Sequence, residues 1–311
     1  MRLYTILALT TALAACSGGA GVREAENVDM SNRVPLPAGP NGRTGNTLCL
    51  NAAGPGMPDT YKRIESVLGP GAIEAPSDSV YTPPRPHVVE LASDGIVGPY
   101  FGILAIEPTD LNQDMVPAGR GGDRSRTEIK IAPDAGPQDP FKAVEGDTYV
   151  YSWRFRIARN MRFSSSFTHI HQIKAHGGTF SDPPLITFTP LLNGYMDVRF
   201  VGNNATSSSG YSSLGSVSVG KLIGQWVDVR EEVTYSNTKG RYKLSIRNQA
   251  GTNLLDIDKS GLQTWRTGAD HMRPKWGIYR KHDGALNRSD DYVYFANFAI
   301  SNSATPDSNC R

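Results

Sequence analysis

The chain has 311 residues, and its 32 Lys and Arg nearly balance 30 Asp and Glu, leaving a net charge of +2. This balance lacks the concentrated positive charge of a nucleic-acid-binding protein, so we expect no nucleic-acid partner. The length suits one large domain after the N-terminal segments, and we find neither an internal repeat nor a phosphate-binding glycine motif.

Residues 1–15 predict a bacterial export signal. Met1 and Arg2 precede an apolar run at 3–14 that is too short to cross a membrane as a mature helix. Leu13-Ala14-Ala15 before Cys16 resembles the lipobox of bacterial lipoproteins, which implies cleavage before Cys16 and a lipid on that cysteine. Ser17, in place of Asp, favours the outer membrane. We therefore expect an exported protein anchored to the cell envelope, in the outer membrane or periplasm.

The next segment, residues 16–47, is rich in Gly, Pro, Asn and Ser and predicts a flexible tether. We place the folded domain at residues 48–311. Its two cysteines, Cys49 and Cys310, lie near its ends in an oxidising compartment, which favours a disulfide over two free thiols.

One short helix is expected near the start of the domain, at residues 61–68. Asp59 is its predicted N-cap and Gly69 ends it. Strand patterns dominate after that point. Residues 148–157 alternate large apolar side chains with a largely polar set, as a strand with one buried face does.

Further strands are predicted as hairpins and pairs. Asn193-Gly194 is a strong hairpin turn between 185–191 and 195–201. Other predicted strands are 225–235, 241–247, 276–281 and 292–300. Many strands with Gly and Pro turns predict an all-β jelly roll, a two-sheet antiparallel sandwich. The polar residues 203–210 form either an inert loop or a lid beside a groove.

Three strands carry polar side chains in alternation: 124–130, 169–174 and 276–282. In the second, strict alternation directs Thr168, Ile170, Gln172 and Lys174 to one face and Phe167, His169, His171 and Ile173 to the other. Adjacent placement of the three strands would gather one cationic face suited to an anionic polymer. Its members are Arg126, Glu128, Gln172, Lys174, Tyr279 and Lys281.

Such a face suits β-elimination of a polyuronate. The reaction needs groups that neutralise the carboxylate, a base for the C5 proton and an acid for the leaving oxygen. Arg, Gln, Lys or His can hold the carboxylate, and Tyr or His can move the proton. A glycoside hydrolase instead needs two carboxylates about 5–10 Å apart. These strands offer only Glu128, with Asp283 just beyond, which disfavours hydrolysis.

The same strands resemble the signature strands of jelly-roll polysaccharide lyases, a group that includes alginate lyases, glucuronan lyases and heparin lyase I. The similar segments are Arg124-Ser125-Arg126-Thr127-Glu128-Ile129-Lys130, His171-Gln172-Ile173-Lys174 and Lys275-Trp276-Gly277-Ile278-Tyr279-Arg280. The resemblance implies a concanavalin A-like β-jelly roll that cleaves an acidic polysaccharide and requires no cofactor. It also implies that Arg126 and Gln172 neutralise the carboxylate and that Tyr279 is the acid, and also the base.

One departure concerns the base. Alginate lyases carry a His in a Q-I-H motif where this chain has Lys174, and His171 precedes the Gln instead. The catalytic base is therefore one of His171, Lys174 and Tyr279. The same departure favours glucuronan over alginate as the substrate. We expect substrate contacts from five further residues of these strands. They are Lys174, Lys281, Arg280, Glu128 and Lys130.

Several of these residues also have structural interpretations. Glu128 fits an ion-pair partner of Arg126 or Lys130, and His169 and His171 fit the inner sheet face better than a metal site, since no third ligand is evident. His176 beside two glycines indicates a turn. Trp265 and Trp276 fit the core, and Asp290-Asp291 is either a solvated acidic pair or a structural Ca²⁺ site.

We expect a monomer whose partners are an anionic polysaccharide and, through Cys16, a membrane. The alternative function is a carbohydrate-binding surface lipoprotein without catalysis. Such a protein would use Tyr279 for stacking and would tolerate Phe there.

Overall fold

The computed structural model describes residues 42–44, 46–56, 59–78, 83–106, 123–136, 138–202, 204–207, 210–283, 286, 290–302 and 310. The predicted signal, Cys16 and most of the predicted tether lie outside these residues. The predictions made for them therefore stay predictions.

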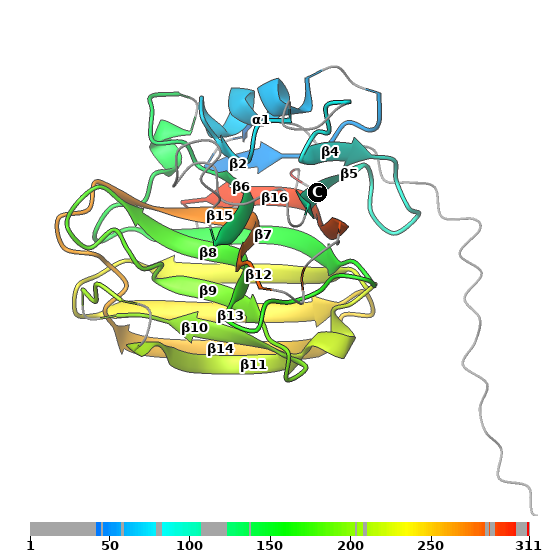
Figure 1. Cartoon of the computed structure of the whole chain (residues 1–311). Helices are drawn as coiled ribbons and strands as arrows, with labels where there is room; N and C mark the ends of the chain where they lie inside the picture. The colour runs from blue at the N-terminus through cyan, green and yellow to red at the C-terminus, as the bar shows by residue number, and fades with distance from the viewer. Residues whose placement is uncertain are drawn as a thin grey trace, which may run out of the picture. The chain divides into compact units, whose positions relative to one another are not determined.

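Two antiparallel sheets form the fold (Figure 1). The strands of the first are β1 Gly42–Thr44, β2 Thr47–Leu50, β4 Val88–Leu91, β5 Tyr100–Ile106, β7 Thr148–Ile157, β12 Val227–Thr234, β13 Gly240–Asn248, β14 Asn253–Leu262 and β16 Asp290–Ser301. Its order is β1-β2-β16-β7-β12-β13-β14, with β5 paired to β16 and β4 to β5. The strands of the second are β3 Ile73–Glu74, β6 Arg124–Lys130, β8 Thr168–His176, β9 Ile186–Pro190, β10 Tyr195–Phe200, β11 Ser212–Ser218 and β15 His271–Lys281. Its order is β11-β10-β9-β8-β15-β6-β3.

The predicted all-β sandwich is confirmed, and the hydrophobic pattern explains it. Strand β7 has the predicted bounds, and its alternate side chains Tyr149, Tyr151, Trp153, Phe155 and Ile157 are buried in the core between the sheets. Both tryptophans assigned to the core, Trp265 and Trp276, are buried there. The predicted hairpin of β9 and β10 and the predicted pair of β12 and β13 both form.

The single α-helix of the described residues, α1 (Thr60–Leu68), also forms where expected. Gly69 ends it with a φ of 91°, a conformation that glycine adopts readily. Asp59 occupies the N-cap position as predicted, but its backbone is left-handed and its side chain makes no capping hydrogen bond. The carboxylate pairs with Lys62 at 3.0 Å instead. No helix in the described ranges is long and apolar enough to span a membrane.

The N-terminal part of the domain extends both sheets. The predicted disulfide joins Cys49 on β2 to Cys310, and β2 pairs with β16. The sheet reaches back to β1, so folded structure begins before the predicted boundary at residue 48. Strand β3 continues the other sheet beyond β6. Figure 1 shows α1, β2, β4 and β5 together at one end of the sandwich.

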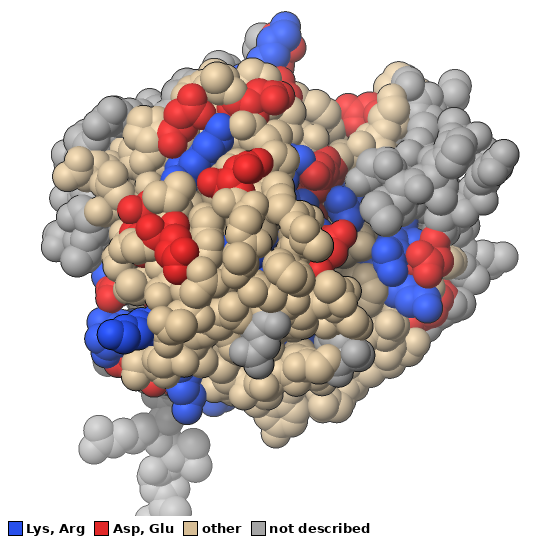
Figure 2. Space-filling view, turned by 90° about the vertical axis from the view of Figure 1, so that its left-hand side faces the viewer, with Lys and Arg blue, Asp and Glu red and all other residues tan. Residues whose placement is uncertain are grey.

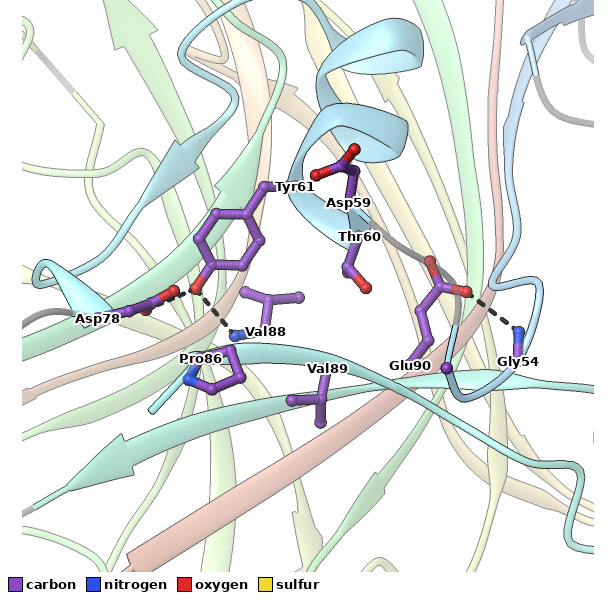
Figure 3. Close-up of a pocket in the computed structure, with 10 residues that line it drawn as sticks. Gly54, Asp59, Thr60, Tyr61, Asp78, Pro86, Val88, Val89 and Glu90 are labelled. Atoms are coloured by element: carbon purple, nitrogen blue, oxygen red, sulfur yellow. Dashed lines mark hydrogen bonds between the residues drawn. The ribbon is translucent and has the colours of Figure 1, made fainter. Parts of the chain in front are cut away.

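A hollow of about 440 Å³ separates α1 from β4 (Figure 3). Most of its polar side chains have partners within the chain. The Tyr61 hydroxyl donates to Asp78 at 2.9 Å, and Glu90 accepts from the amide of Gly54 at 3.1 Å. These bonds anchor the N-terminal segment to the sandwich, and this hollow contains none of the polar strand residues singled out in the sequence.

Candidate active site

The three polar strands lie side by side, as predicted, with β15 between β8 and β6. Their register forms two cross-strand rows. In one row, Tyr279 lies opposite Arg126 on β6 and opposite His169 on β8. In the other row, Lys275 lies opposite Lys130 and Gln172. Opposite residues in adjacent strands hold their side chains within contact range, so each row is a compact polar group.

A groove of about 520 Å³ crosses this part of the sheet. Its charged lining residues are Arg124, Arg126, Lys174, Arg199 and Asp182. Its aromatic and amide-bearing lining residues are Phe167, His169, Gln172, Tyr211 and Tyr279. The groove is therefore cationic and rich in hydrogen-bond donors. On the face shown in Figure 2, acidic and basic side chains are interspersed among uncharged ones.

A register shift at the centre of the groove changes the predicted alternation. Between His171 and His169 on β8 one residue, Ile170, faces two residues of β15, Gly277 and Ile278. Such a bulge changes the face to which neighbouring side chains point. Ile170 and His171 consequently both lie in the core, whereas His169 lines the groove. Strict alternation had placed His169 on the core side and Ile170 on the polar side.

His169 thus lies beside Tyr279 in the groove, with ring centroids 6.1 Å apart. Its Nδ1 is 2.9 Å from the hydroxyl of Thr189, which holds the ring in place. Burial, and secondarily the positive charge of Arg199, lower the pKa of His169 to about 3. The imidazole is therefore uncharged at neutral pH.

On the other side of Tyr279, Arg126 stacks on the phenol ring with its guanidinium carbon 4.2 Å from the ring centroid. The guanidinium also lies 3.4 Å from Glu74 and 3.7 Å from Glu128. These two carboxylates and the ring together orient Arg126 along the groove floor. Phe167 packs edge-on against Tyr279 at 5.3 Å and fixes the phenol from the opposite side.

Gly277 allows the floor of the groove to form. It lies on β15 opposite Glu128, and across it the side-chain amide of Gln172 donates to Glu128. A Cβ at this position would lie 2.1 Å from the carbonyl oxygen of Thr127, and the φ of Gly277 is +149°. Only glycine fits this backbone, so Gly277 permits the close pairing of β15 with β6. That pairing allows the Gln172 side chain of β8 to reach Glu128 of β6 across β15.

Beside Arg126, an ion-pair cluster that is largely buried joins Glu74 and Glu128 to cations of β6 and β15. Lys130 and Lys275 both pair with Glu74, and Lys275 lies 3.3 Å from Glu128. The two lysines hold the pKa of Glu74 well below its usual range, although burial alone would raise it. Glu128 and Lys130 do not line the groove. This corrects their assignment to substrate contact: their charges are used within the cluster, as the ion-pair interpretation of Glu128 requires.

The assignment of His171 as a catalytic residue is also wrong. It is 1% exposed in the core, where Nδ1 donates to the carbonyl of Lys275 at 2.8 Å and Nε2 lies 2.8 Å from Glu231 of the other sheet. Its ring packs 4.5 Å from Trp153. A residue enclosed in this way cannot touch a substrate, so it is not a catalytic residue.

Arg280 points away from the groove, because adjacent residues of β15 point to opposite faces of the sheet and Tyr279 points into the groove. It is fully buried, and its guanidinium donates to Asp291 at 2.7 Å. Asp290 in turn pairs with Arg85 at 2.7 Å, so arginines occupy the acidic pair considered for Ca²⁺. In the described part of the chain, no group of three or more His, Cys, Asp or Glu is arranged to hold a metal ion.

The two remaining lysines differ in position. Lys174 lines the groove and pairs with Asp182. Burial lowers the pKa of the Lys174 ammonium, and Asp182 opposes that shift. Lys281 lies 3.9 Å from Asp123, half exposed, and is not among the residues that line the groove.

Residues not predicted for the site are His169, Arg124, Arg199 and Tyr211. One sequence signal could have found the first, because an isolated glycine within a strand pattern, here Gly277, often marks a bulge. His176 lies at the end of β8 before Gly177 and Gly178, both with positive φ, as a turn requires. Thr206 and Ser207 line the groove, so the predicted loop does lie beside it, while residues 203, 208 and 209 are outside the described ranges.

Solved structures of alginate lyases are similar to this chain. The marine PL-14 alginate lyase from Aplysia kurodai has 13% identity, with 81% of this chain and 98% of that chain covered and a TM-score of 0.52. The alginate lyase Aly36B in complex with alginate trisaccharide has 15% identity, coverage of 82% and 98%, and a TM-score of 0.49. The family 7 alginate lyase A1-II′ in complex with substrate has 13% identity, coverage of 75% and 93%, and a TM-score of 0.48.

At 13% identity, the likeness to the Aplysia kurodai enzyme, whose TM-score is above 0.5, supports the fold alone. No curated protein sequence matches the chain. A family model described as polysaccharide lyase matches residues 100–299, which include all three polar strands and most of the two sheets. The chain belongs to the polysaccharide lyase family.

Proposed function

We propose that this protein cleaves a polyuronate by β-elimination in the groove over β6, β15 and β8. The row Arg126–Tyr279–His169, with Gln172 beside it, is the observation that carries the proposal. It combines a cation and an amide for the carboxylate with an imidazole and a phenol able to exchange protons. Membership of the polysaccharide lyase family supports the same reaction.

Arg126 and Gln172 bind the uronate carboxylate, which makes the C5 proton acidic by stabilising the negative charge that develops when it leaves. Neutral His169 accepts this proton, and the C5–H electron pair forms the C4=C5 double bond. The C4–O bond breaks, and the leaving oxygen takes the proton of the Tyr279 hydroxyl. His169 then returns its proton to the neighbouring phenolate, which restores both groups.

The low pKa of His169 applies to the groove without a bound substrate. A bound uronate brings negative charge close to the imidazole, which raises its pKa toward the range of an effective base. Lys174 pairs with Asp182, which favours the charged ammonium, so we assign it a positive charge in the groove and not the role of base. Alginate and glucuronan are the candidate substrates, and the similar solved structures include complexes of alginate lyases with alginate oligosaccharides.

The carboxylates that line the groove are too few for the mechanism of a glycoside hydrolase. Among the described residues that line the groove, Asp182 is the one carboxylate, and it pairs with Lys174. Inverting and retaining glycosidases both need two carboxyl groups across the scissile bond.

The function is tested by incubating the purified domain with glucuronan, polymannuronate, polyguluronate, hyaluronan and heparin in turn. We expect ultraviolet absorbance from an unsaturated uronate with one of them. Absence of such a product with every polymer, together with retention on one in an affinity gel, would instead support the carbohydrate-binding lipoprotein.

We propose further that the protein is exported and anchored through a lipid on Cys16, acts as a monomer and needs no cofactor. The lipobox-like residues before Cys16 and the disulfide between Cys49 and Cys310 support export. Incorporation of a labelled fatty acid should be seen in the full chain and lost in Cys16→Ser. Labelling of both would contradict the assigned anchor.

A further inference from the structure

The groove continues well past the proposed reaction centre. From Tyr279 on β15 it crosses β8 and β9 to Arg199 on β10 and Tyr211 just before β11. Three strand spacings separate β15 from β10, a distance of about 14 Å. This is longer than one sugar ring, so a polymer bound at Tyr279 would reach Arg199 if it lay along the groove.

Arg199 is held in a defined orientation. Its Nε lies 3.2 Å from Asp197 on the same strand, and Asp197 also accepts a hydrogen bond from the Ser213 hydroxyl on β11. The guanidinium carbon lies 4.0 Å from the centroid of the Tyr211 ring. Its side chain is 14% exposed, so most of its contact with water has been replaced by these groups.

Tyr211 complements this cation. At 41% exposure it is one of the few large apolar side chains of the described residues that remain open to solvent. Its ring can pack on the C–H face of a sugar, while the guanidinium of Arg199 can donate paired hydrogen bonds to a carboxylate. A charged donor and an aromatic surface at adjacent positions fit a uronic acid residue better than a neutral sugar.

We propose that Arg199 and Tyr211 form a second uronate-binding subsite, remote from the bond that is cleaved, which makes the enzyme prefer chains long enough to reach both places. This inference rests on the proposed function and deepens it. Occupation of both positions by one polymer corresponds to cleavage within chains.

The position of Arg199 also links the two ends of the groove. Its positive charge contributes to the lowered pKa of His169. A uronate bound at Arg199 partly neutralises this charge and so makes His169 a better base. A long substrate therefore binds more tightly and also makes His169 a stronger base.

The experiment compares kcat/KM on size-fractionated oligomers of the polymer that the wild type cleaves. In Arg199→Gln, the ratio of kcat/KM for long chains to that for the shortest cleaved oligomer should fall about 10- to 100-fold, as loss of a charged hydrogen bond predicts. Tyr211→Ala should lower the same ratio, and Arg199→Lys should partly restore it. The matched control is Arg241→Gln, which removes an exposed Arg paired with Asp258 on the other sheet and should leave the ratio unchanged.

An unchanged ratio in both Arg199→Gln and Tyr211→Ala would overturn the subsite while leaving the lyase function intact. If the wild type forms no unsaturated product from any polyuronate, the proposed function fails, and the subsite is still tested by affinity electrophoresis in gels containing each polyuronate. Weaker retardation of Arg199→Gln than of Arg241→Gln would support the subsite, and equal retardation would overturn it.

Discussion

Substituting Gly277 by Ala perturbs the groove at one backbone position. The new Cβ would lie 2.1 Å from the Thr127 carbonyl oxygen and 2.7 Å from the Glu128 Cα, both backbone atoms of β6. Neither can rotate away, so β6 and β15 must separate. Separation moves Arg126 and Glu128 relative to Tyr279 and Gln172, because they belong to opposite sides of the altered pairing.

Two effects set the size of the loss. Overpacking costs about 1–3 kcal/mol, and a non-glycine residue at a φ of +149° adds about 1–3 kcal/mol. Together they predict a decrease in the free energy of unfolding of about 2–6 kcal/mol, a large part of the stability of a typical domain. A shift of Arg126 on the order of 1 Å predicts a loss of about 10²-fold in kcat/KM.

Urea unfolding and initial rates of unsaturated product formation measure the two effects separately. The matched control is Gly261→Ala on β14, where φ is +73° but no atom lies within 4 Å of the added Cβ. It should lose about 1–3 kcal/mol from backbone strain and keep its kcat/KM. Wild-type stability and activity in Gly277→Ala would refute the role assigned to this glycine.

Three further predictions concern the cluster, the amide and the disulfide. Because the pKa of Glu74 is lowered in the folded state, its contribution to stability is present above the unfolded Glu value of about 4.3 and is lost as the pH falls below it. Glu74→Gln should therefore lower the free energy of unfolding by about 3 kcal/mol at pH 7 and make urea unfolding less dependent on acid pH. An unaltered dependence on acid pH would exclude this role. Gln172→Ala should lower the rate of product formation on the order of 10²-fold, and an unchanged rate would remove Gln172 from the site. Replacing Cys49 and Cys310 together by Ala should lower the urea midpoint, with a loss of up to about 5 kcal/mol for so long a loop, whereas free-thiol labelling of the unreduced wild type would contradict the linkage.

Much of the fold could be predicted because strand periodicity is a local property. The alternation in β7 and the turn at Asn193-Gly194 are each encoded within a few residues, and both appear in the structure as expected. The adjacency of β6, β15 and β8 is a long-range property. The polar alternation of the three strands raised it only as a condition, and the resemblance of their motifs to polysaccharide lyases favoured it.

The position of His169 could not be predicted from alternation. A one-residue register shift between β8 and β15 changes which imidazole faces the groove, and neither strand alone encodes the pairing that produces it. The same limit applies to Arg280 and Lys130. Whether a cation faces a substrate or a buried carboxylate depends on its partners, here Asp291 and Glu74, which lie elsewhere in the chain.

The most direct test of elimination in this groove is the rate of unsaturated product formation by Tyr279→Phe, measured alongside its binding to the same polymer. The variant keeps the ring that Arg126 stacks on and removes only the hydroxyl that donates the proton. We predict that turnover is abolished and binding is nearly intact. If Tyr279→Phe keeps most of its activity, the phenol is not the acid and the mechanism is wrong.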